Sequence, residues 1–443
     1  MSAEARKPID KNCLLRADLA NYQSASNLSF NTKIKELQRS GHKIYHFGFG
    51  QSPFPVPDYM QSALSKHAHV HEYLSVHGLL ELRSKILRLH ESDLDASIDH
   101  YSTERMLMGA GSKELIYLVL NVSRGPVLLA SPSWTTYKPQ THLAGKPCHV
   151  VPTYREHRYM VLPNVLEKIV SGCPSDEYKF LILNSPSNPT GQVYSRAQLR
   201  DLAVVCRRHR ILVISDEIYA RLTFEGVEFC SMAEMYPEGT IVTSGFSKWA
   251  SLGGWRLGYA LFPSSLHHLY VAVASAASHT YTCAPAPMQY ALVDALEHTQ
   301  QLDQYVKHCA KILAAIGDYA HNRLHQVGVE SHASQAGYYF MPEFHVLKHR
   351  FKNGTELCDA MLQEINVALM PCDPHYLRPD EELTTRFCFV NFDGEAGLRE
   401  SIRLGDRAKL DEAFLKKYCA PTVEGIEVIA MWVEKHRLVE NGR

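Results

Sequence analysis

The sequence predicts an α/β protein whose larger domain is built on a mostly parallel β-sheet with helices on both faces. Three apolar runs, residues 125–130 (GPVLLA), 178–183 (YKFLIL) and 211–214 (ILVI), are continuous rather than alternating. Continuous runs are typical of strands that are buried on both faces of a sheet. A helical pattern over residues 195–209 lies between two of these runs. Strands that alternate with helices in this way indicate a parallel sheet.

Two further strands are predicted over residues 240–243 (TIVT) and 258–262 (GYALF). Most of the predicted strands end in small or polar residues, at Ser131, Asn184, Asp216 and Ser244. Parallel sheets bind their ligands at the carboxyl ends of the strands. We therefore expect a ligand site where these strand ends meet.

The pattern changes after Tyr270 and predicts a second, smaller α+β domain. A long amphipathic helix is expected over residues 302–325, and a last helix over residues 423–436. An N-terminal arm with a helix over residues 31–38 is expected to pack against this domain. Short strands are expected between the two long helices, over residues 337–344, 367–371 and 386–392. The predicted division is 1–55 for the arm and small-domain segment, 56–300 for the large domain and 301–443 for the C-terminal small domain.

The composition excludes several classes of protein. With 46 basic and 47 acidic side chains among 443 residues, the net charge of −1 predicts no attraction to nucleic acid or to an anionic membrane. No apolar run approaches 18 residues, so no membrane span is expected. The 11 cysteines contain no C-x-x-C pair and the N-terminus has no apolar core, which predicts reduced thiols in a cytoplasmic protein. No metal site is expected, because His71-Glu72 and His77 have the wrong spacing for two ligands on one helix.

Two loops at predicted strand ends are candidates for ligand binding. Residues 108–113 (MGAGSK) precede a helical pattern, and small residues before a helix let backbone N–H groups contact a phosphate. An ordinary glycine-rich turn is the alternative. Residues 184–191 (NSPSNPTG) form a constrained loop that presents Asn188 as a donor, with a plain turn as the alternative.

Two charged residues carry the chemistry that we predict. Asp216 follows four apolar residues, and a carboxylate at the end of a buried strand needs a partner. The alternative is a helix N-cap, with Glu217 and Tyr219 opening the helix. Lys248 lies among small and aromatic residues, where a lysine loses pKa and becomes a nucleophile. A solvated surface lysine is the alternative, and Arg256 nearby would suit a phosphate.

The order of these motifs resembles the class I and II aminotransferases, the pyridoxal-phosphate enzymes of fold type I. The residues that carry the resemblance are SPSNPTG, SDEIY, GFSK and GWRLGY, and it runs from about residue 24 to residue 392. The sequence is most similar to the branch that includes bacterial-type aspartate and prephenate aminotransferases. The resemblance implies a seven-stranded-type sheet and pyridoxal 5′-phosphate as the cofactor.

The resemblance also implies a role for each residue around the cofactor ring. Lys248 would form the Schiff base with the cofactor aldehyde, and Asp216 would pair with the protonated pyridine nitrogen. This pair makes the ring an electron sink, so that Lys248 can move the α-proton. Tyr219 and Asn188 would hold the phenolic oxygen, and Trp134 would stack on the ring.

The phosphate and the substrate would be bound at opposite ends of the site. The residues implied for the phosphate are Arg256, Gly111, Ser112, the backbone near Lys113, and Tyr73 of the neighbouring subunit in a homodimer. Many relatives have a hydroxyl where this chain has Gly245, and Ser244 or Ser247 would compensate. Arg386 would bind the substrate α-carboxylate beside Gly50.

Lys113 suggests glutamate or aspartate as the amino donor, because in the resembling branch a lysine here contacts the distal carboxylate. A solvent-facing lysine is the alternative. The expected reaction is ping-pong transfer of an amino group between an L-amino acid and a 2-oxo acid. A lyase or decarboxylase of the same fold is the first alternative, and an inactive regulator is the second. Residues 372–385 (CDPHYLRPDEELTT) are unusual for the family and are expected to cover the substrate site.

Overall fold

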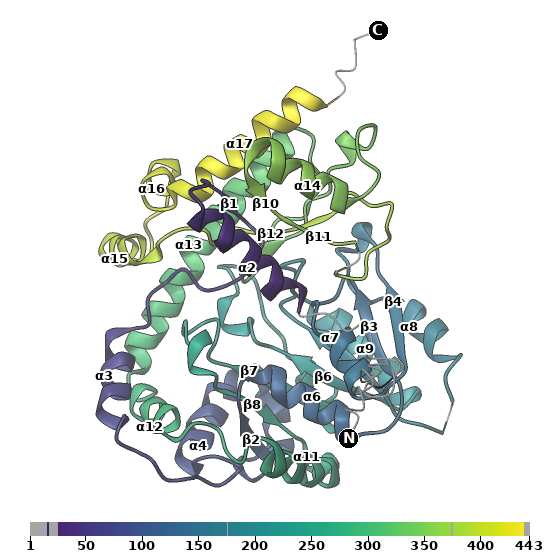
Figure 1. The fold of residues 1–443 in the computed structure, drawn as a ribbon. Coiled ribbons are helices and arrows are strands. Elements are labelled where there is room, and N and C mark those ends of the chain that lie inside the picture. Colours follow the sequence, from purple (N-terminus) through teal and green to yellow (C-terminus); the bar gives the residue numbers. More distant parts are fainter. Residues whose placement is uncertain (1–15, 17–24, 175, 374, 438–443) are drawn as a thin grey trace, which may run out of the picture.

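The structure is a computed structural model that describes residues 16, 25–174, 176–373 and 375–437. Much of the predicted N-terminal arm, residues 1–15 and 17–24, therefore lies outside the described residues, as do residues 438–443. The described part of the chain forms a larger part around one sheet and a smaller part around two short sheets (Figure 1).

The larger part is built on a seven-stranded sheet, as predicted. In spatial order its strands are β2 (Met106–Gly109), β8 (Gly258–Leu261), β7 (Thr240–Gly245), β6 (Ile211–Asp216), β5 (Lys179–Asn184), β3 (Val127–Ser131) and β4 (Cys148–Pro152). Six of these strands run in one direction, and β8 runs in the opposite direction between β2 and β7. A short loop without a crossover helix joins β7 to β8, and such a connection leaves the strands antiparallel. The strands β2 and β4, which form the two edges of the sheet, were not predicted.

Helices cover both faces of this sheet, because its strands are apolar on both sides. One face packs against α6 (Ser112–Val122) and α11 (His267–Thr280). The other face packs against α8 (Pro163–Val170), α9 (Arg196–Arg208) and α10 (Met232–Met235). The predicted helix 195–209 is α9, which begins at a capping box formed by Ser195 and Gln198. The remaining helices of this part are α3 (Asp58–His67), α4 (Leu80–Leu89), α5 (Glu91–Leu94), α7 (Tyr137–Leu143) and α12 (Ala286–Ala295).

The register of the sheet brings the predicted polar strand ends together. Asn184 at the end of β5 is paired with Asp216 at the end of β6, and Asp216 is paired with Thr243 of β7. The three residues therefore lie side by side at the carboxyl edge. This edge faces the smaller part of the molecule (Figure 1).

The smaller part combines the N-terminal helix with the C-terminal segment of the chain, from β9 onward. Its sheets are β1 (Tyr45–His46) with β10 (Val367–Ala368), and β11 (Met370–Pro371) with β12 (Thr385–Cys388) and β9 (Tyr339–Phe340). Its helices are α2 (Ser26–Arg39), α14 (Gly354–Ile365), α15 (Gly394–Leu404), α16 (Glu412–Tyr418) and α17 (Ala420–His436). The strand predicted over residues 337–344 is limited to β9, because the chain beyond it forms only isolated bridges at Glu343. Helix α2 packs against this part through Ile34, which shares a cluster with Ala368.

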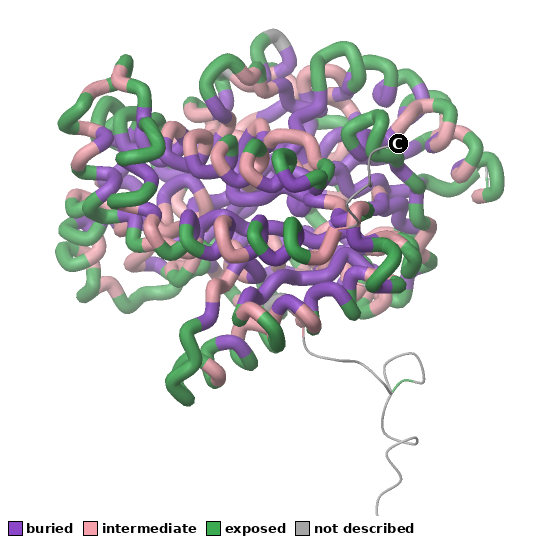
Figure 2. Tube along the Cα trace, turned by 90° about the horizontal axis from the view of Figure 1, so that it is seen from above, coloured by how far each residue is buried: buried purple, intermediate pink, exposed green. Residues whose placement is uncertain are grey.

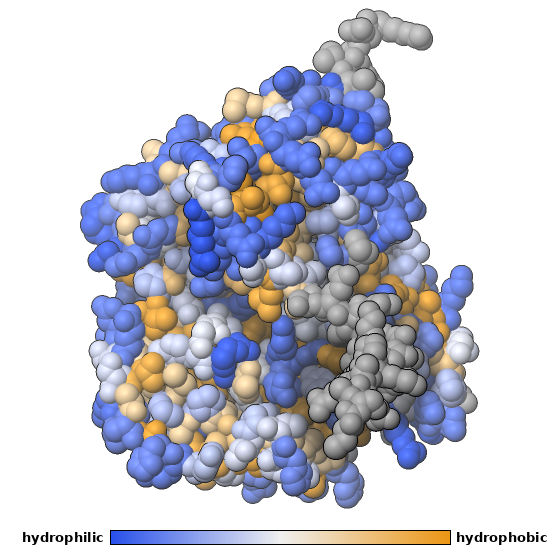
Figure 3. Space-filling view, in the orientation of Figure 1, coloured by the Kyte–Doolittle hydropathy of each residue, from blue (hydrophilic) through white to orange (hydrophobic). Residues whose placement is uncertain are grey.

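Helix α13 (Thr299–Gln326) corresponds to the long amphipathic helix of the prediction and runs between the two parts (Figure 1). In Figure 2 the buried trace fills the centre of the molecule and the exposed trace lies at its outside. The face drawn in Figure 3 is mostly hydrophilic, and its hydrophobic patches are broken up by polar side chains. Within the described ranges, no helix combines the length and the apolar character needed to cross a membrane.

Candidate active site

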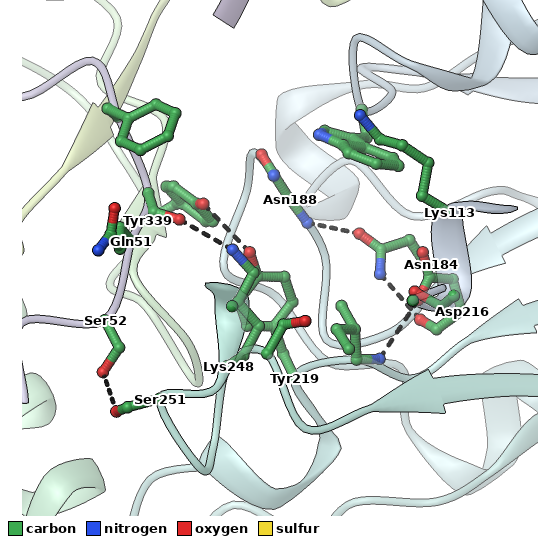
Figure 4. A pocket seen from close by; sticks show the side chains of 18 of the residues that line it. Gln51, Ser52, Lys113, Asn184, Asn188, Asp216, Tyr219, Lys248, Ser251 and Tyr339 are labelled. Carbon is green, nitrogen blue, oxygen red and sulfur yellow. Dashed lines mark hydrogen bonds between the residues drawn. The ribbon is translucent and has the colours of Figure 1, made fainter. Parts of the chain in front are cut away.

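A cavity of about 580 Å³ lies at the carboxyl edge of the seven-stranded sheet, between the larger and smaller parts (Figure 4). All but two of the predicted site residues line it. Those that do are Gly50, Gly111, Ser112, Lys113, Trp134, Asn188, Asp216, Tyr219, Ser247, Lys248, Arg256 and Arg386. The two that do not are Tyr73 and Ser244.

Lys248 lies in the loop after β7 and projects into the cavity. Its Nζ donates a hydrogen bond of 2.8 Å to the carbonyl oxygen of Gly50, and it lies 5.6 Å from the ring centroid of Tyr219. The Tyr338 hydroxyl donates to the Lys248 carbonyl oxygen at 2.9 Å, which fixes the backbone. Burial lowers the pKa of Lys248 to about 8. The neutral fraction near neutral pH is therefore larger than for an ordinary lysine, which favours a nucleophilic role.

The loop that carries Lys248 is tied to the smaller part by hydroxyl groups. The Ser251 hydroxyl lies 2.6 Å from that of Ser52 and 2.6 Å from that of Tyr305. Tyr305 in turn donates to the carbonyl oxygen of Pro55 at 3.0 Å. These bonds hold the loop against residues 52–55 and α13.

Asp216 is buried at the end of β6, with 3% of its surface exposed. The Tyr137 hydroxyl donates to its Oδ2 at 2.6 Å, and the Ile218 N–H donates to its Oδ1 at 3.3 Å. Burial raises the pKa of Asp216 to about 6, although these hydrogen bonds oppose the rise. The N-cap alternative is wrong, because the turn after Asp216 leads only to a 3₁₀ turn at Ala220–Leu222. A cationic partner in the cavity would restore the ionised form of this carboxylate.

The loop after β5 is held in place by Asn184. Its side-chain oxygen accepts from the Asn188 N–H at 2.7 Å, and its amide nitrogen donates to the Asp216 carbonyl oxygen at 2.8 Å. These two bonds join the loop to the neighbouring strand β6. Asn188 thereby lines the cavity wall, and its role as a donor to a ligand stays a prediction.

The N-terminus of α6 and Arg256 form a cationic cradle at one end of the cavity. Arg256 donates to the carbonyl oxygens of Ala110, at 2.9 Å, and Gly253, at 3.1 Å. Gly111 precedes α6 with φ of 90°, and a Cβ there would lie 2.3 Å from the Arg256 guanidinium. A glycine is therefore required at this position. Free N–H groups at a helix start, together with an arginine, bind a phosphate well.

The structure explains why residue 245 is a glycine. A Cβ at Gly245 would lie 2.9 Å from the Leu257 carbonyl oxygen and 3.0 Å from the Gly258 Cα, so the β7–β8 pair leaves little room for a side chain. Of the two serines considered as substitutes, Ser247 lines the cavity. Ser244 is buried and donates to the Glu217 carbonyl oxygen at 3.3 Å.

Arg386 of β12 lies on the side of the cavity formed by the smaller part, with 2% of its surface exposed. It donates to the Gly48 carbonyl oxygen at 2.5 Å and makes a long contact of 3.5 Å with the Asn188 side-chain oxygen. Its guanidinium lies against the rings of Tyr339 and Tyr376, at 4.7 and 5.3 Å. Its Nε has no hydrogen-bond partner, and no carboxylate among the described residues forms an ion pair with it. A buried cation in this condition is suited to an anionic ligand.

Lys113 lies at the cavity wall (Figure 4), which Trp134 also lines. The Lys113 Nζ lies 5.0 Å from the indole centroid, and burial and the nearby Arg256 lower the pKa of Lys113. The lysine predicted to face either the substrate or the solvent therefore lines the cavity.

Tyr73 lies elsewhere, and 86% of its surface is exposed. Nothing in this chain binds its ring or its hydroxyl among the described contacts. A role at this cavity would therefore require a second copy of the chain.

The sequence analysis missed several residues of the site. Tyr137 follows Trp134 by three residues, but only the structure shows that its hydroxyl bonds to Asp216. Tyr339 lies in a strand of the smaller part, where a buried tyrosine is ordinarily a core residue. Asn184 carried a signal, because it is the first polar residue after a buried strand. No group of three or more His, Cys, Asp or Glu side chains in the described part of the chain is arranged to hold a metal ion.

The chain matches known proteins over most of its length. The aminotransferase class I and II family matches residues 43–395. An aspartate aminotransferase from Geobacillus stearothermophilus is 29% identical over 369 residues, covering 80% of this chain and 89% of that protein. A probable aspartate/prephenate aminotransferase from Aquifex aeolicus is 27% identical over 367 residues, covering 81% of this chain and 90% of that protein.

Solved structures share the fold. The aspartate aminotransferase from Thermus thermophilus with maleate has a TM-score of 0.78 at 23% identity, covering 89% of this chain and 99% of that one. The family match includes every residue that lines the cavity except Leu28. The chain belongs to the aminotransferase class I and II family, and it is a pyridoxal-phosphate-dependent aminotransferase.

Proposed function

We propose that the chain transfers an amino group between an L-amino acid and a 2-oxo acid by a ping-pong reaction, with aspartate or glutamate as an acidic substrate. The observation that carries the proposal is that Lys248 and Arg386 line the same cavity. A lysine of lowered pKa and a buried arginine with no carboxylate partner among the described residues line one cavity. An amino acid offers an anionic α-carboxylate for the arginine and an α-proton for the lysine.

The residues present fit the cofactor. Lys248 would hold its aldehyde carbon, Asp216 its ring nitrogen, and Arg256 with the start of α6 its phosphate. Asp216 supports this assignment because burial has raised its pKa and a protonated ring nitrogen would supply the missing positive charge. Tyr219 and Asn188 would hold the phenolic oxygen, and Trp134 would cover one face of the ring. When bound, the cofactor supplies an electron sink for the bond broken at the substrate Cα.

The protein residues then perform the positioning and the proton transfer. Arg386 would bind the α-carboxylate with two parallel hydrogen bonds, which orients the Cα–H bond. Lys248 in its neutral form would take the α-proton on Nζ and return it later in the reaction. The hydrogen bonds of Ser251 and Tyr338 hold the Lys248 loop in place for this transfer.

Lys113 is the residue that we propose for acidic substrates. It lines the cavity beside Trp134, and within the described residues no carboxylate forms an ion pair with it. A distal carboxylate in the cavity would therefore meet a partly buried cation. Burial strengthens such a pair relative to one in water.

A panel of single-substrate half-reactions tests this function. The enzyme loaded with pyridoxal 5′-phosphate is mixed with one amino acid at a time, in the absence of any 2-oxo acid. We expect aspartate or glutamate to convert the cofactor to its amine form, which absorbs near roughly 330 nm, with one 2-oxo acid released per site. In Lys113→Ala the preference for aspartate over alanine should fall about ten-fold, the value of one charge-assisted hydrogen bond.

Lys138→Ala is the matched control, because Lys138 is an exposed lysine of α7 close to Trp134 that does not line the cavity. Its preference should match that of the unaltered chain. An unchanged preference in Lys113→Ala would refute the role of Lys113. Release of ammonia or carbon dioxide in place of the amine form would instead identify a lyase or decarboxylase.

We also propose a homodimer in which Tyr73 reaches the phosphate of the partner's site. The proposal is supported by the exposure of Tyr73, which has no binding contact described in its own chain. We expect twice the chain mass in solution, and weaker cofactor binding in Tyr73→Phe. Hybrids of Tyr73→Phe with Lys248→Ala should regain one tight site, because the intact tyrosine and the intact lysine then come from different chains. Tight, active monomers would contradict the assignment.

We propose the same division of the chain as the sequence indicated, namely 1–55, 56–300 and 301–443. It is supported by the position of α13, which begins near the second boundary and runs between the two parts. It is also supported by the pairing of β1 with β10, which attaches the N-terminal segment to the C-terminal one.

A further inference from the structure

Two tyrosine hydroxyls face each other beside Lys248. The Tyr219 and Tyr339 hydroxyl oxygens lie 3.1 Å apart, and 3% and 2% of the two residues are exposed. Their rings meet edge to face, with centroids 5.8 Å apart and an interplanar angle of 84°. Tyr219 follows β6 of the larger part and Tyr339 lies in β9 of the smaller part, so this bond joins the two parts inside the cavity (Figure 4).

The position of Tyr339 depends on Gly50. A Cβ at residue 50 would lie 1.6 Å from the Tyr339 hydroxyl oxygen, so only glycine leaves room for this hydroxyl. The carbonyl oxygen of Gly50 accepts the hydrogen bond from Lys248, and the ring of Tyr339 lies against Arg386. Tyr339 therefore contacts two features of the site. One is Gly50, which binds Lys248, and the other is Arg386, the arginine proposed for the substrate carboxylate.

The number of protons that the two hydroxyls can donate restricts the direction of the hydrogen bonds that they form. A phenol has one proton to donate and can also accept. In the described contacts the only hydrogen-bond partner of the Tyr339 hydroxyl is Tyr219, whose hydroxyl is the donor in the structure. If Tyr219 donates its proton to an anionic oxygen in the cavity, its remaining link to Tyr339 requires that Tyr339 donates to Tyr219. Hydrogen bonds in such a chain strengthen one another by roughly 10–30% each.

We propose that Tyr339 is a positioning residue that donates to the Tyr219 hydroxyl and so strengthens the bond from Tyr219 to the anionic phenolic oxygen of the cofactor beside Lys248. The inference rests on the proposed role of Tyr219. Stabilising that oxygen favours the state in which the nitrogen joined to the cofactor carries no proton. Tyr339 therefore adjusts the protonation of the lysine-bound cofactor without touching the reacting atoms.

The test is the pH dependence of the visible absorbance of the cofactor-loaded enzyme, measured without substrate. In Tyr339→Phe the midpoint of this transition should rise by about half a pH unit, which reflects a cooperative contribution. In Tyr219→Phe it should rise by about one to two units, because the direct bond to the anion is lost. In the double variant the midpoint should equal that of Tyr219→Phe alone, because Tyr339 acts through Tyr219.

Tyr376→Phe is the matched control. Tyr376 is also buried against Arg386, but its hydroxyl bonds to the Met370 sulfur at 3.7 Å. Its midpoint should equal that of the unaltered enzyme. A midpoint that is unchanged or lowered in Tyr339→Phe, or a further rise in the double variant, overturns the inference. If the cofactor-loaded enzyme shows no visible band, or if the band persists in Lys248→Ala, the proposed function itself is overturned.

Discussion

Replacing Lys248 with alanine is expected to lower kcat by about 10⁴-fold, the upper end of what a positioned proton-transfer group contributes. The reason is that Lys248 is the cavity residue whose amine has both a lowered pKa and a position at the end of β7, opposite Gly50. The measurement is the single-turnover rate with aspartate, followed by absorbance and by the 2-oxo acid produced. The visible band of the lysine-bound cofactor should be lost in the same variant.

Lys146→Ala is the control for Lys248→Ala, because it shows what the loss of a buried lysine does to stability when that lysine has no role in the reaction. Lys146 is buried, its Nζ donates to the Gly125 carbonyl oxygen at 3.0 Å, and burial lowers its pKa to about 8, as for Lys248. It does not line the cavity. We expect Lys146→Ala to unfold more easily and to keep its turnover. Full turnover in Lys248→Ala would refute the proposed mechanism.

The central strands of the sheet could be predicted because their burial is visible in the local sequence. Continuous apolar runs identify β3, β5, β6 and β7, and the polar residues that end them identify the ligand edge. The edge strands β2 and β4 were not predicted, although they are as long as β8 and β3, because strand preference depends on pairing with neighbouring strands as well as on the strand's own pattern. The direction of β8 followed from the connection to β7, which only the structure displays.

The site was predictable where a residue departs from its surroundings. Lys248 and Asp216 are charged residues in apolar segments, and such departures mark functional positions. Tyr339 lies in an apolar segment (GYYF), whose context is that of ordinary core residues, and Tyr137 lies in a polar segment (TTYKPQ) that gives no sign of a buried partner. Their roles depend on hydroxyl partners 79 and 120 positions away in the chain, and such contacts leave no trace in local sequence.

Replacing Arg386 with lysine is expected to lower kcat/KM for aspartate about 100-fold, with most of the change in KM. Lysine keeps the charge but loses the planar fork that makes two parallel bonds to a carboxylate. A loss of about 100-fold is near the upper end of what one charge-assisted hydrogen bond contributes, because Arg386 is more deeply buried than Lys113. Arg386 already uses one nitrogen on the Gly48 carbonyl oxygen, so the lysine must also leave that acceptor or the substrate unsatisfied. Steady-state kinetics with aspartate and 2-oxoglutarate would measure the change.

Arg378→Lys is the control for Arg386→Lys, because it makes the same substitution at an arginine that does not line the cavity. Arg378 is half-buried and also lies against a tyrosine ring, at 5.1 Å from Tyr159, but its guanidinium is already paired with Glu382 at 2.5 and 2.8 Å. It belongs to the segment 372–385 and donates to the Ser131 and Thr153 carbonyl oxygens of the larger part. Its fork therefore serves the protein rather than a ligand. We expect Arg378→Lys to lower the unfolding temperature and to leave KM close to that of the unaltered chain, whereas equal effects of the two variants on KM would show that Arg386 acts only through packing.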